Sequence, residues 1–180
     1  MEFNELFKQI SPDDISDNVF TLVREELAVV TSGKSSTFNS MIASGGGLGL
    51  IFKKPVIWCI FKKDRYTLEM IKKEHTYTLS YFPDKYREQI LFLASKSGRN
   101  SSKMKEVELT SVQTPLNNIS FKEARLIIEC KLIQITTPSP NDFYAQECRD
   151  YINKVYKDEK DYREYVFGEI TNVWIKDNNY

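Results

Sequence analysis

The sequence predicts a single, mainly antiparallel β domain with peripheral helices, of the α+β class, over residues 1–180. Short runs rich in β-branched and aromatic residues recur along the chain, and the segments between them do not form regular βαβ units. One long run also changes the parity of its apolar residues midway, which indicates a β-bulge of the kind that lets barrels turn corners. The composition, 41% hydrophobic and 28% charged, is that of a globular protein.

The first three predicted strands differ in burial. Residues 27–32 form a short β-branched run that ends at Gly33, and residues 56–61 form another after Pro55; both read as buried strands. Residues 76–81 alternate instead, with tyrosine and leucine on one face and threonine and serine on the other. This alternation is typical of a strand with one wetter side.

Two longer strands are predicted near the C-terminus. In residues 126–135 the apolar side chains keep one parity and then change to the other; they are Leu126, Ile128, Cys130 and Leu132, followed by Ile133 and Ile135. We therefore expect a β-bulge where the parity changes. Residues 165–175 form the last strand, interrupted by Gly168.

Three helices are expected between these strands. Residues 68–73 form a short one, and Asp84 and Asp142 are placed to cap two longer ones. The apolar faces of these longer helices would hold Tyr86, Ile90, Leu93 and Ala94 in one, and Tyr144, Cys148, Tyr151, Ile152 and Val155 in the other. Within the single domain, residues 1–20 are expected as an N-terminal extension and residues 141–160 as a helical insertion before the last strand.

Charge and composition argue against several classes of protein. Lys plus Arg and Asp plus Glu both total 25, so the basic excess of a nucleic-acid-binding protein is missing. The N-terminus lacks the pattern of a signal peptide, and no apolar run is long enough to span a bilayer, so we expect a cytoplasmic protein without membrane contact. The three cysteines are scattered and His75 is the sole histidine, so no metal site is expected, and His75 should lie at the surface near a helix C-terminus.

The least ordinary segment is residues 37–49, where four of the seven glycines fall within five positions. Such a segment lets the backbone approach a ligand closely, and its N–H groups can cradle an anion or face a planar ring. An ordinary turn between two strands would have the same composition. Spacing alone does not separate these two interpretations.

Two further segments combine hydroxyl and basic side chains. Residues 62–67 include Arg65 and end in Thr67, a candidate N-cap, and a helix start of this kind can bind phosphate. Residues 95–103 are similar but read by default as a solvated loop. Read singly, each segment could also be plain surface, whereas three together favour a phosphate ligand. None of them has the glycine spacing of a Walker or Rossmann loop.

These segments carry a resemblance to a known family. The chain resembles the flavin-reductase-like, FMN-binding split-barrel family, in particular its flavoredoxin-like branch, over residues 18–175. Residues 39–49, Asn-Ser-Met-Ile-Ala-Ser-Gly-Gly-Gly-Leu-Gly, are similar to the family's Asn-Thr-Met-Thr-Ala-Ser-Trp-Gly-Gly-Leu-Gly motif. The shorter matches, in the family's order, are Pro55-Val56, Arg65-Tyr66-Thr67, Leu79-Ser80-Tyr81-Phe82, Ser97-Gly98-Arg99, Glu123-Ala124 with Glu129-Cys130, and Gly168-Glu169-Ile170.

The resemblance implies an antiparallel Greek-key split barrel that binds FMN non-covalently at the interface of a homodimer. It places the backbone of Asn39, Ser40, Met41, Ile42, Ala43 and Ser44 along the isoalloxazine ring. It places Arg65, Thr67 and a basic residue of the loop that contains Arg99 and Lys103 at the phosphate. Tyr66, Phe82 and Ser97 are the remaining cofactor-binding residues that it implies. No catalytic residue can be assigned.

This sequence departs from the family pattern at four positions. Gly45 stands where the motif has Trp, and Ile42 replaces a Thr. Asn100 and Ser102 each replace an Asp after Ser-Gly-Arg. The changes at positions 42 and 45 bear on the wall of the expected flavin site.

The resemblance favours an FMN-binding oxidoreductase, first of all an NAD(P)H-dependent flavin reductase, with NAD(P)H as its co-substrate. One alternative is a flavoredoxin-like electron carrier that acts with a protein partner. A second is a relative that no longer binds flavin and is not an enzyme. The electron acceptor, a small molecule or a protein, is not fixed by the sequence.

Overall fold

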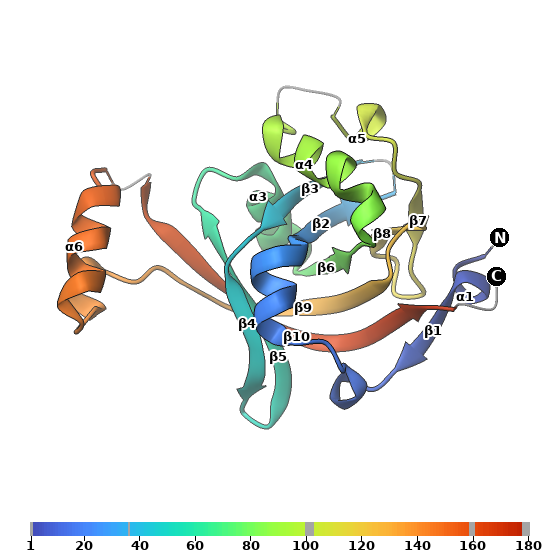
Figure 1. Ribbon diagram of the computed structural model, residues 1–180, viewed down its shortest axis with the longest axis horizontal. Coiled ribbons are helices and arrows are strands. Elements are labelled where there is room, and N and C mark those ends of the chain that lie inside the picture. Colours follow the sequence, from blue (N-terminus) through green and yellow to red (C-terminus); the bar gives the residue numbers. More distant parts are fainter. Residues whose placement is uncertain (1, 36, 100–102, 159–160, 178–180) are drawn as a thin grey trace.

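The computed structural model describes residues 2–35, 37–99, 103–158 and 161–177 (Figure 1). Its main feature is one eight-stranded antiparallel sheet with strand order β3-β2-β6-β9-β10-β5-β4, in which β1 also pairs with β10. The path runs from β3 at one end to β4 at the other without closing, so the barrel is split. The predicted mainly β, antiparallel fold with peripheral helices is confirmed. The strands are β1 (Phe7–Ile10), β2 (Ala28–Lys34), β3 (Thr37–Ala43), β4 (Gly46–Ile51), β5 (Lys54–Lys62), β6 (Thr76–Tyr81), β9 (Leu126–Thr136) and β10 (Arg163–Lys176), with β7 (Ser111–Gln113) and β8 (Ile119–Phe121) as a separate hairpin.

Helices α3 and α4 pack on different sides of β3. Side chains alternate along a strand, so neighbours on β3 point to opposite faces. Met41 joins the apolar cluster that contains Leu68 of α3, whereas Ile42 packs against the cluster that contains Leu93 of α4. Strand β3 therefore lies between the two helices. The helices are α1 (Phe3–Leu6), α2 (Val19–Thr21, continued by a π-helical turn, Leu22–Glu26), α3 (Tyr66–Glu74), α4 (Arg87–Ser95, after a 3₁₀ turn, Asp84–Tyr86), α5 (Lys103–Glu106) and α6 (Gln146–Val155).

The β-bulge predicted from the change of parity is present in β9. Phe167 of β10 pairs with Gln134 and the next residue, Gly168, pairs with Leu132, so Ile133 is the extra residue of β9. Packing requires a glycine at position 168. A Cβ at this position would lie 2.2 Å from the Tyr77 hydroxyl oxygen, far inside van der Waals contact.

The glycine-rich segment is two strands, β3 and β4, joined by a short turn. Two of its glycines are explained by packing against Trp58 on β5. A Cβ on Gly46, which has a φ of +147°, would lie 1.9 Å from the Trp58 carbonyl oxygen, and one on Gly47 would lie 2.6 Å from the Trp58 ring. These glycines let β4 approach β5 closely, so the glycine cluster alone is no evidence for a ligand.

Three predicted helix caps are wrong. Helix α3 begins two residues earlier than expected, so Thr67 is its second residue and Arg65 takes the cap position. Asp84 lies in the turn before α4 and its side chain caps nothing. Asp142 closes the 3₁₀ turn Pro140–Asp142 by accepting from the Ser139 N–H group, and α6 starts four residues later. In each case the polar residue lies near the helix start, and the register was missed by one turn or less.

Helix α6 follows β9 and precedes β10 in the sequence, and it lies apart from the body of the sheet (Figure 1). Of its predicted apolar face only Ile152 is buried, whereas Tyr151 is 66% exposed and Cys148 is also exposed. Tyr144 precedes the helix and is 91% exposed. The predicted apolar face therefore loses Tyr144, and no described residue of this chain covers most of the rest of it.

Strand β1, His75 and Cys59 complete the description of the fold. Strand β1, from the expected N-terminal extension, pairs with β10 and is part of the sheet. His75 is exposed at the C-cap of α3, as predicted. Burial raises the pKa of the Cys59 thiol to about 12, so this thiol stays protonated near neutral pH. Among the described residues, no helix is long and apolar enough to cross a membrane.

Candidate functional site

The three segments singled out in the sequence meet at one pocket of about 160 Å³, here called the Asn39 pocket. It lies where the edge of β3, the start of α3 and the end of α4 come together. Eight of the predicted site residues line it: Asn39, Met41, Ile42, Arg65, Tyr66, Thr67, Ser97 and Lys103. The other lining residues are Asp64, Leu93, Ala94, Lys96 and Gly98.

Asn39 is the junction of the three segments. Its side chain is buried on β3, and its Nδ2 donates a 2.8 Å hydrogen bond to the Thr67 hydroxyl in the first turn of α3. The loop after α4 lies against the same amide, because a Cβ on Gly98 would be 1.9 Å from Asn39 Oδ1. Thr67 is thus not a helix cap but the partner that fixes the orientation of Asn39.

The pocket has an excess of positive charge. Arg65, Lys96 and Lys103 line it with a single carboxylate, that of Asp64. Lys96 forms an ion pair with Glu106 at 2.5 Å. Arg65 is exposed, and no hydrogen bond or ion pair of its guanidinium is seen within the described residues. The net charge and the unengaged guanidinium favour an anionic ligand.

Lys103 is a buried cation in the lining of the pocket. It is 3% exposed, and its Nζ donates 3.1 Å hydrogen bonds to the carbonyl oxygens of Leu93 and Lys96 at the end of α4. Burial, together with repulsion from Arg65, lowers the pKa of Lys103 to about 8. An anion bound in the pocket would offset both effects and favour the protonated side chain.

The start of α3 adds backbone donors to these side chains. The first N–H groups of an α-helix have no partner within the helix, and Tyr66 and Thr67 at this end both line the pocket. Arg99, also a predicted site residue, does not line the pocket. Its guanidinium is 5.3 Å from the centre of the Tyr66 ring and forms an ion pair with Glu69, which lowers the pKa of that carboxyl.

Strand β3 supplies a free backbone edge next to the pocket. It is the terminal strand of the sheet and, among the described residues, pairs with β2 alone, so alternate N–H and C=O groups point away from the sheet. The side chains of its other predicted residues do not reach the pocket. Ser40 is buried and hydrogen-bonds Thr31 at 2.8 Å, Ala43 is buried in the barrel core, and Ser44 is exposed in the turn after the strand.

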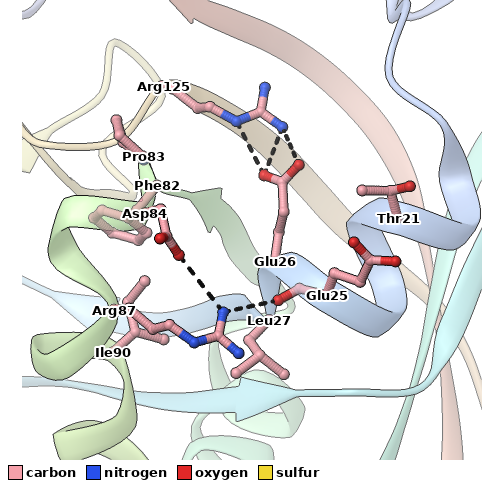
Figure 2. Close-up of a pocket in the computed structure, with 10 residues that line it drawn as sticks. All are labelled: Thr21, Glu25, Glu26, Leu27, Phe82, Pro83, Asp84, Arg87, Ile90 and Arg125. Atoms are coloured by element: carbon pink, nitrogen blue, oxygen red, sulfur yellow. Dashed lines mark hydrogen bonds and ion pairs between the residues drawn. The ribbon is translucent and has the colours of Figure 1, made fainter.

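Phe82 lies outside the Asn39 pocket. Its buried ring lines a second cavity, of about 360 Å³, near the N-terminal end of α4 (Figure 2). We call this the Phe82 cavity, lined by Thr21, Glu25, Glu26, Leu27, Phe82, Pro83, Asp84, Arg87, Ile90 and Arg125. The two departures at Asn100 and Ser102 lie outside the described residues.

Sequence reasoning missed five residues of the Asn39 pocket. Asp64, Lys96 and Gly98 lie within residues 62–67 and 95–103, the two segments that combine hydroxyl and basic side chains. Their position within these segments was the signal that could have identified them. Leu93 and Ala94 read as the apolar face of a helix and gave no sign of a ligand site. Of the departures, Ile42 lines the pocket, while a Cβ on Gly45 would meet only Ile60, at an ordinary contact distance of 3.6 Å.

The open antiparallel barrel is that of a split-barrel protein, and a cationic pocket lies beside its edge strand. The flavin reductase like domain model matches residues 22–180, and the chain belongs to this family. No curated protein sequence is significantly similar to it.

Solved structures share the fold at low identity. Flavoredoxin of Desulfovibrio vulgaris is 20% identical with a TM-score of 0.65, over 94% of this chain and 78% of that one. An FMN-binding protein from Thermus thermophilus, with bound p-hydroxybenzaldehyde, is 16% identical with a TM-score of 0.65, over 95% and 83%. A protein with a split barrel domain from Shewanella frigidimarina is 18% identical with a TM-score of 0.65, over 93% and 80%.

Proposed function

We propose that the chain is an FMN-binding oxidoreductase and that the Asn39 pocket holds the FMN phosphate. The observation that supports this most directly is the meeting of three separate segments at one cationic pocket. The residues present fit a phosphate, because Arg65 offers charge-assisted hydrogen bonds and the first turn of α3 offers N–H groups. Asn39 and Thr67 hold each other in place at the base.

The free edge of β3 fits the rest of the cofactor. The polar edge of an isoalloxazine ring carries both donors and acceptors, and an edge strand presents both in alternation. Residues 39–44 would therefore bind the ring through the backbone. This mode of binding does not depend on the side chain at position 42, so the replacement of Thr by Ile leaves it intact.

When bound, FMN would supply the redox chemistry, which is to accept a hydride or electrons and pass them on. The chain's own residues would orient the cofactor and balance its charge. We propose NAD(P)H as the hydride donor, which makes the protein a flavin reductase. The family match favours this function over the others.

The second candidate is an electron carrier that acts with a protein partner. The fold shared with flavoredoxin is the observation that favours it. The third hypothesis, a relative without flavin, has only positions 42 and 45 in its support.

Two steps of one experiment separate the three hypotheses. The purified protein is loaded with FMN, desalted and mixed with NADH or NADPH under anaerobic conditions. A reductase loses its visible flavin absorption within the mixing experiment, whereas a carrier keeps it until a chemical reductant is added. A protein that retains no flavin after desalting would contradict both.

A further inference from the structure

The Phe82 cavity is separate from the Asn39 pocket and has a different character (Figure 2). Both lie along α4, the first near Arg87 and Ile90 and the second near Leu93 and Ala94. The volume of about 360 Å³ is within the range of small-molecule sites. Its wall is apolar where Leu27, Phe82, Pro83 and Ile90 meet.

The backbone that forms one side of this cavity is unusual. The turn before Leu27 is π-helical rather than α-helical. This conformation is rare in proteins, and where it occurs it is often at a functional site. Leu27 itself has a φ of 59° and a ψ of 87°, a left-handed conformation that is costly for a bulky residue. Strain of this kind persists only where the surroundings impose it, and here it sets Leu27 into the wall of a cavity.

An ion-pair network holds this strained turn in place. Arg125 donates to both carboxylate oxygens of Glu26, at 2.6–3.0 Å, and its Nη2 also donates to Asp17 at 2.7 Å. Glu26 is the last residue of the π-helical turn. Burial lowers the pKa of Arg125, but its hydrogen bonds and charge interactions with Asp17 and Glu26 outweigh this and raise the pKa overall, so the guanidinium stays protonated. Glu26 and Arg125 are thereby engaged and are not the groups that would meet a ligand.

The remaining polar groups select the charge of a ligand. Arg87 Nη1 donates to the Glu25 carbonyl oxygen at 3.2 Å and lies 3.9 Å from the Asp84 carboxylate. Its Nε and Nη2 have no partner among the described residues, and Figure 2 shows this guanidinium at the cavity. The carboxylates of Glu25 and Asp84 would repel an anion, and Arg87 would repel a cation. An uncharged acceptor is the group that these residues fit.

We infer that the Phe82 cavity binds a small, uncharged ring compound whose carbonyl oxygen accepts a hydrogen bond from Arg87. The ring packs on Leu27, Phe82 and Ile90, where burial of apolar surface stabilises it. This site goes beyond the proposed flavin function, because its lining shares no residue with the Asn39 pocket. Leu27 precedes Ala28, which pairs with Ala43 at the end of β3, so the ligand lies near the strand proposed to hold the flavin ring.

Acetophenone is a suitable probe, with three matched compounds for comparison. Ethylbenzene lacks the carbonyl, benzoate is an anion and benzylammonium is a cation. Titrations of the full-length protein, followed by ligand-observed NMR, give the dissociation constant of each. We expect acetophenone to bind saturably and more tightly than the other three.

The Arg87→Met variant tests the hydrogen bond, since Arg87 is exposed and its loss should leave the fold intact. We expect it to weaken acetophenone by about tenfold and to leave ethylbenzene unchanged, because a hydrogen bond to a charged donor contributes about that much. Ile90→Trp should fill the cavity and prevent binding, with Leu91→Trp, on the exposed side of α4, as its control.

The Arg65→Ala variant separates this site from the flavin site. It should bind acetophenone as the wild type does, whether or not the protein binds FMN. The inference is overturned if acetophenone does not bind saturably, if benzoate or benzylammonium binds more tightly, or if Arg87→Met leaves acetophenone binding unchanged.

Discussion

At the scale of single residues, the Asn39 pocket combines one fixed group with two cations in different states. Asn39 is held by Thr67 and hemmed in by Gly98, so its position is set before any ligand arrives. Arg65 is exposed and unengaged among the described residues, whereas Lys103 is buried against two carbonyl oxygens. The two cations should therefore affect phosphate binding in different ways.

Replacing Arg65 by Ala should weaken FMN binding by about ten- to a hundredfold, because it removes a charge-assisted hydrogen bond to the phosphate. Quenching of flavin fluorescence on titration gives the dissociation constant. Lys62→Ala is the matched control, since this exposed lysine lies three residues earlier and does not line the pocket. Equal constants for the two variants would remove Arg65 from the phosphate site.

Lys103 should make FMN binding depend on pH. In the free protein its pKa is lowered to about 8, and a bound phosphate favours the protonated form, so the complex holds more protons than the free protein above that pH. Affinity should change little between about pH 7, where the phosphate is mostly doubly ionised, and pH 8, and should fall by up to about tenfold per pH unit above pH 8. The same titration over a range of pH values measures this, and Lys103→Met should abolish the dependence. A wild-type affinity that does not fall above pH 8 would exclude the role.

At the scale of elements, the strands were more predictable than the helices. Parity located the bulge in β9 because a strand with one buried face must keep its register, and an extra residue shows in the pattern. The start of a helix has no such constraint, and Asp84 and Asp142 lie near the first turns without capping them. The edge strand β3 is hard to recognise from sequence because its small polar residues resemble a turn, and its pairing with β2 is what identifies it.

The site was predictable where its residues lie in contiguous sequence motifs. Short motifs located eight residues that line the Asn39 pocket, because each motif is contiguous in sequence. Leu93 and Ala94 could not be found this way, since the packing of α4 against β3 brings them to the pocket. The place of Phe82 in a separate cavity likewise follows from tertiary packing alone.

Glu129 on β9 joins several elements through one buried carboxylate. It accepts hydrogen bonds from Thr114, Asn118, Asn172 and Trp174, so it ties the segment around the β7–β8 hairpin to β10. None of these donors is charged, and the side chain is fully buried. An amide at this position would turn an N–H group toward the N–H of Asn118 or of Trp174.

Glu129→Gln should therefore lower the free energy of unfolding by about 2–4 kcal/mol, because buried donors lose their acceptor. Urea denaturation followed by circular dichroism measures this. Glu147→Gln, at an exposed position of α6, is the control and should change stability by less than about 0.5 kcal/mol. A Glu129 variant as stable as the control would mean that the network contributes little.

At the scale of the whole molecule, large apolar side chains remain uncovered. Phe52 at the β4–β5 turn is 90% exposed, Leu50 is 73% exposed, and Tyr144 beside α6 is 91% exposed. Leu50 and Phe52 lie two residues apart at one hairpin, and large apolar groups exposed close together are typical of a surface that a partner covers. We propose that a second copy of the chain covers part of this surface.

Sedimentation equilibrium of the FMN-loaded protein should give twice the chain mass of 21.0 kDa. Phe52→Ser combined with Leu50→Ser should shift the equilibrium toward the monomer, since both side chains are exposed in the single chain and their loss should not affect its core. A wild-type protein that sediments as a monomer with flavin bound would contradict the dimer.

The proposed function depends on FMN binding, and a visible absorption spectrum of the purified protein measures that binding. The protein is incubated with excess FMN, desalted and scanned, with Arg65→Ala treated in parallel. We expect the wild type to keep its flavin bands, near one FMN per chain, and the variant to lose most of them. A colourless, folded wild-type protein would exclude FMN as its cofactor and leave a split barrel that does not use flavin.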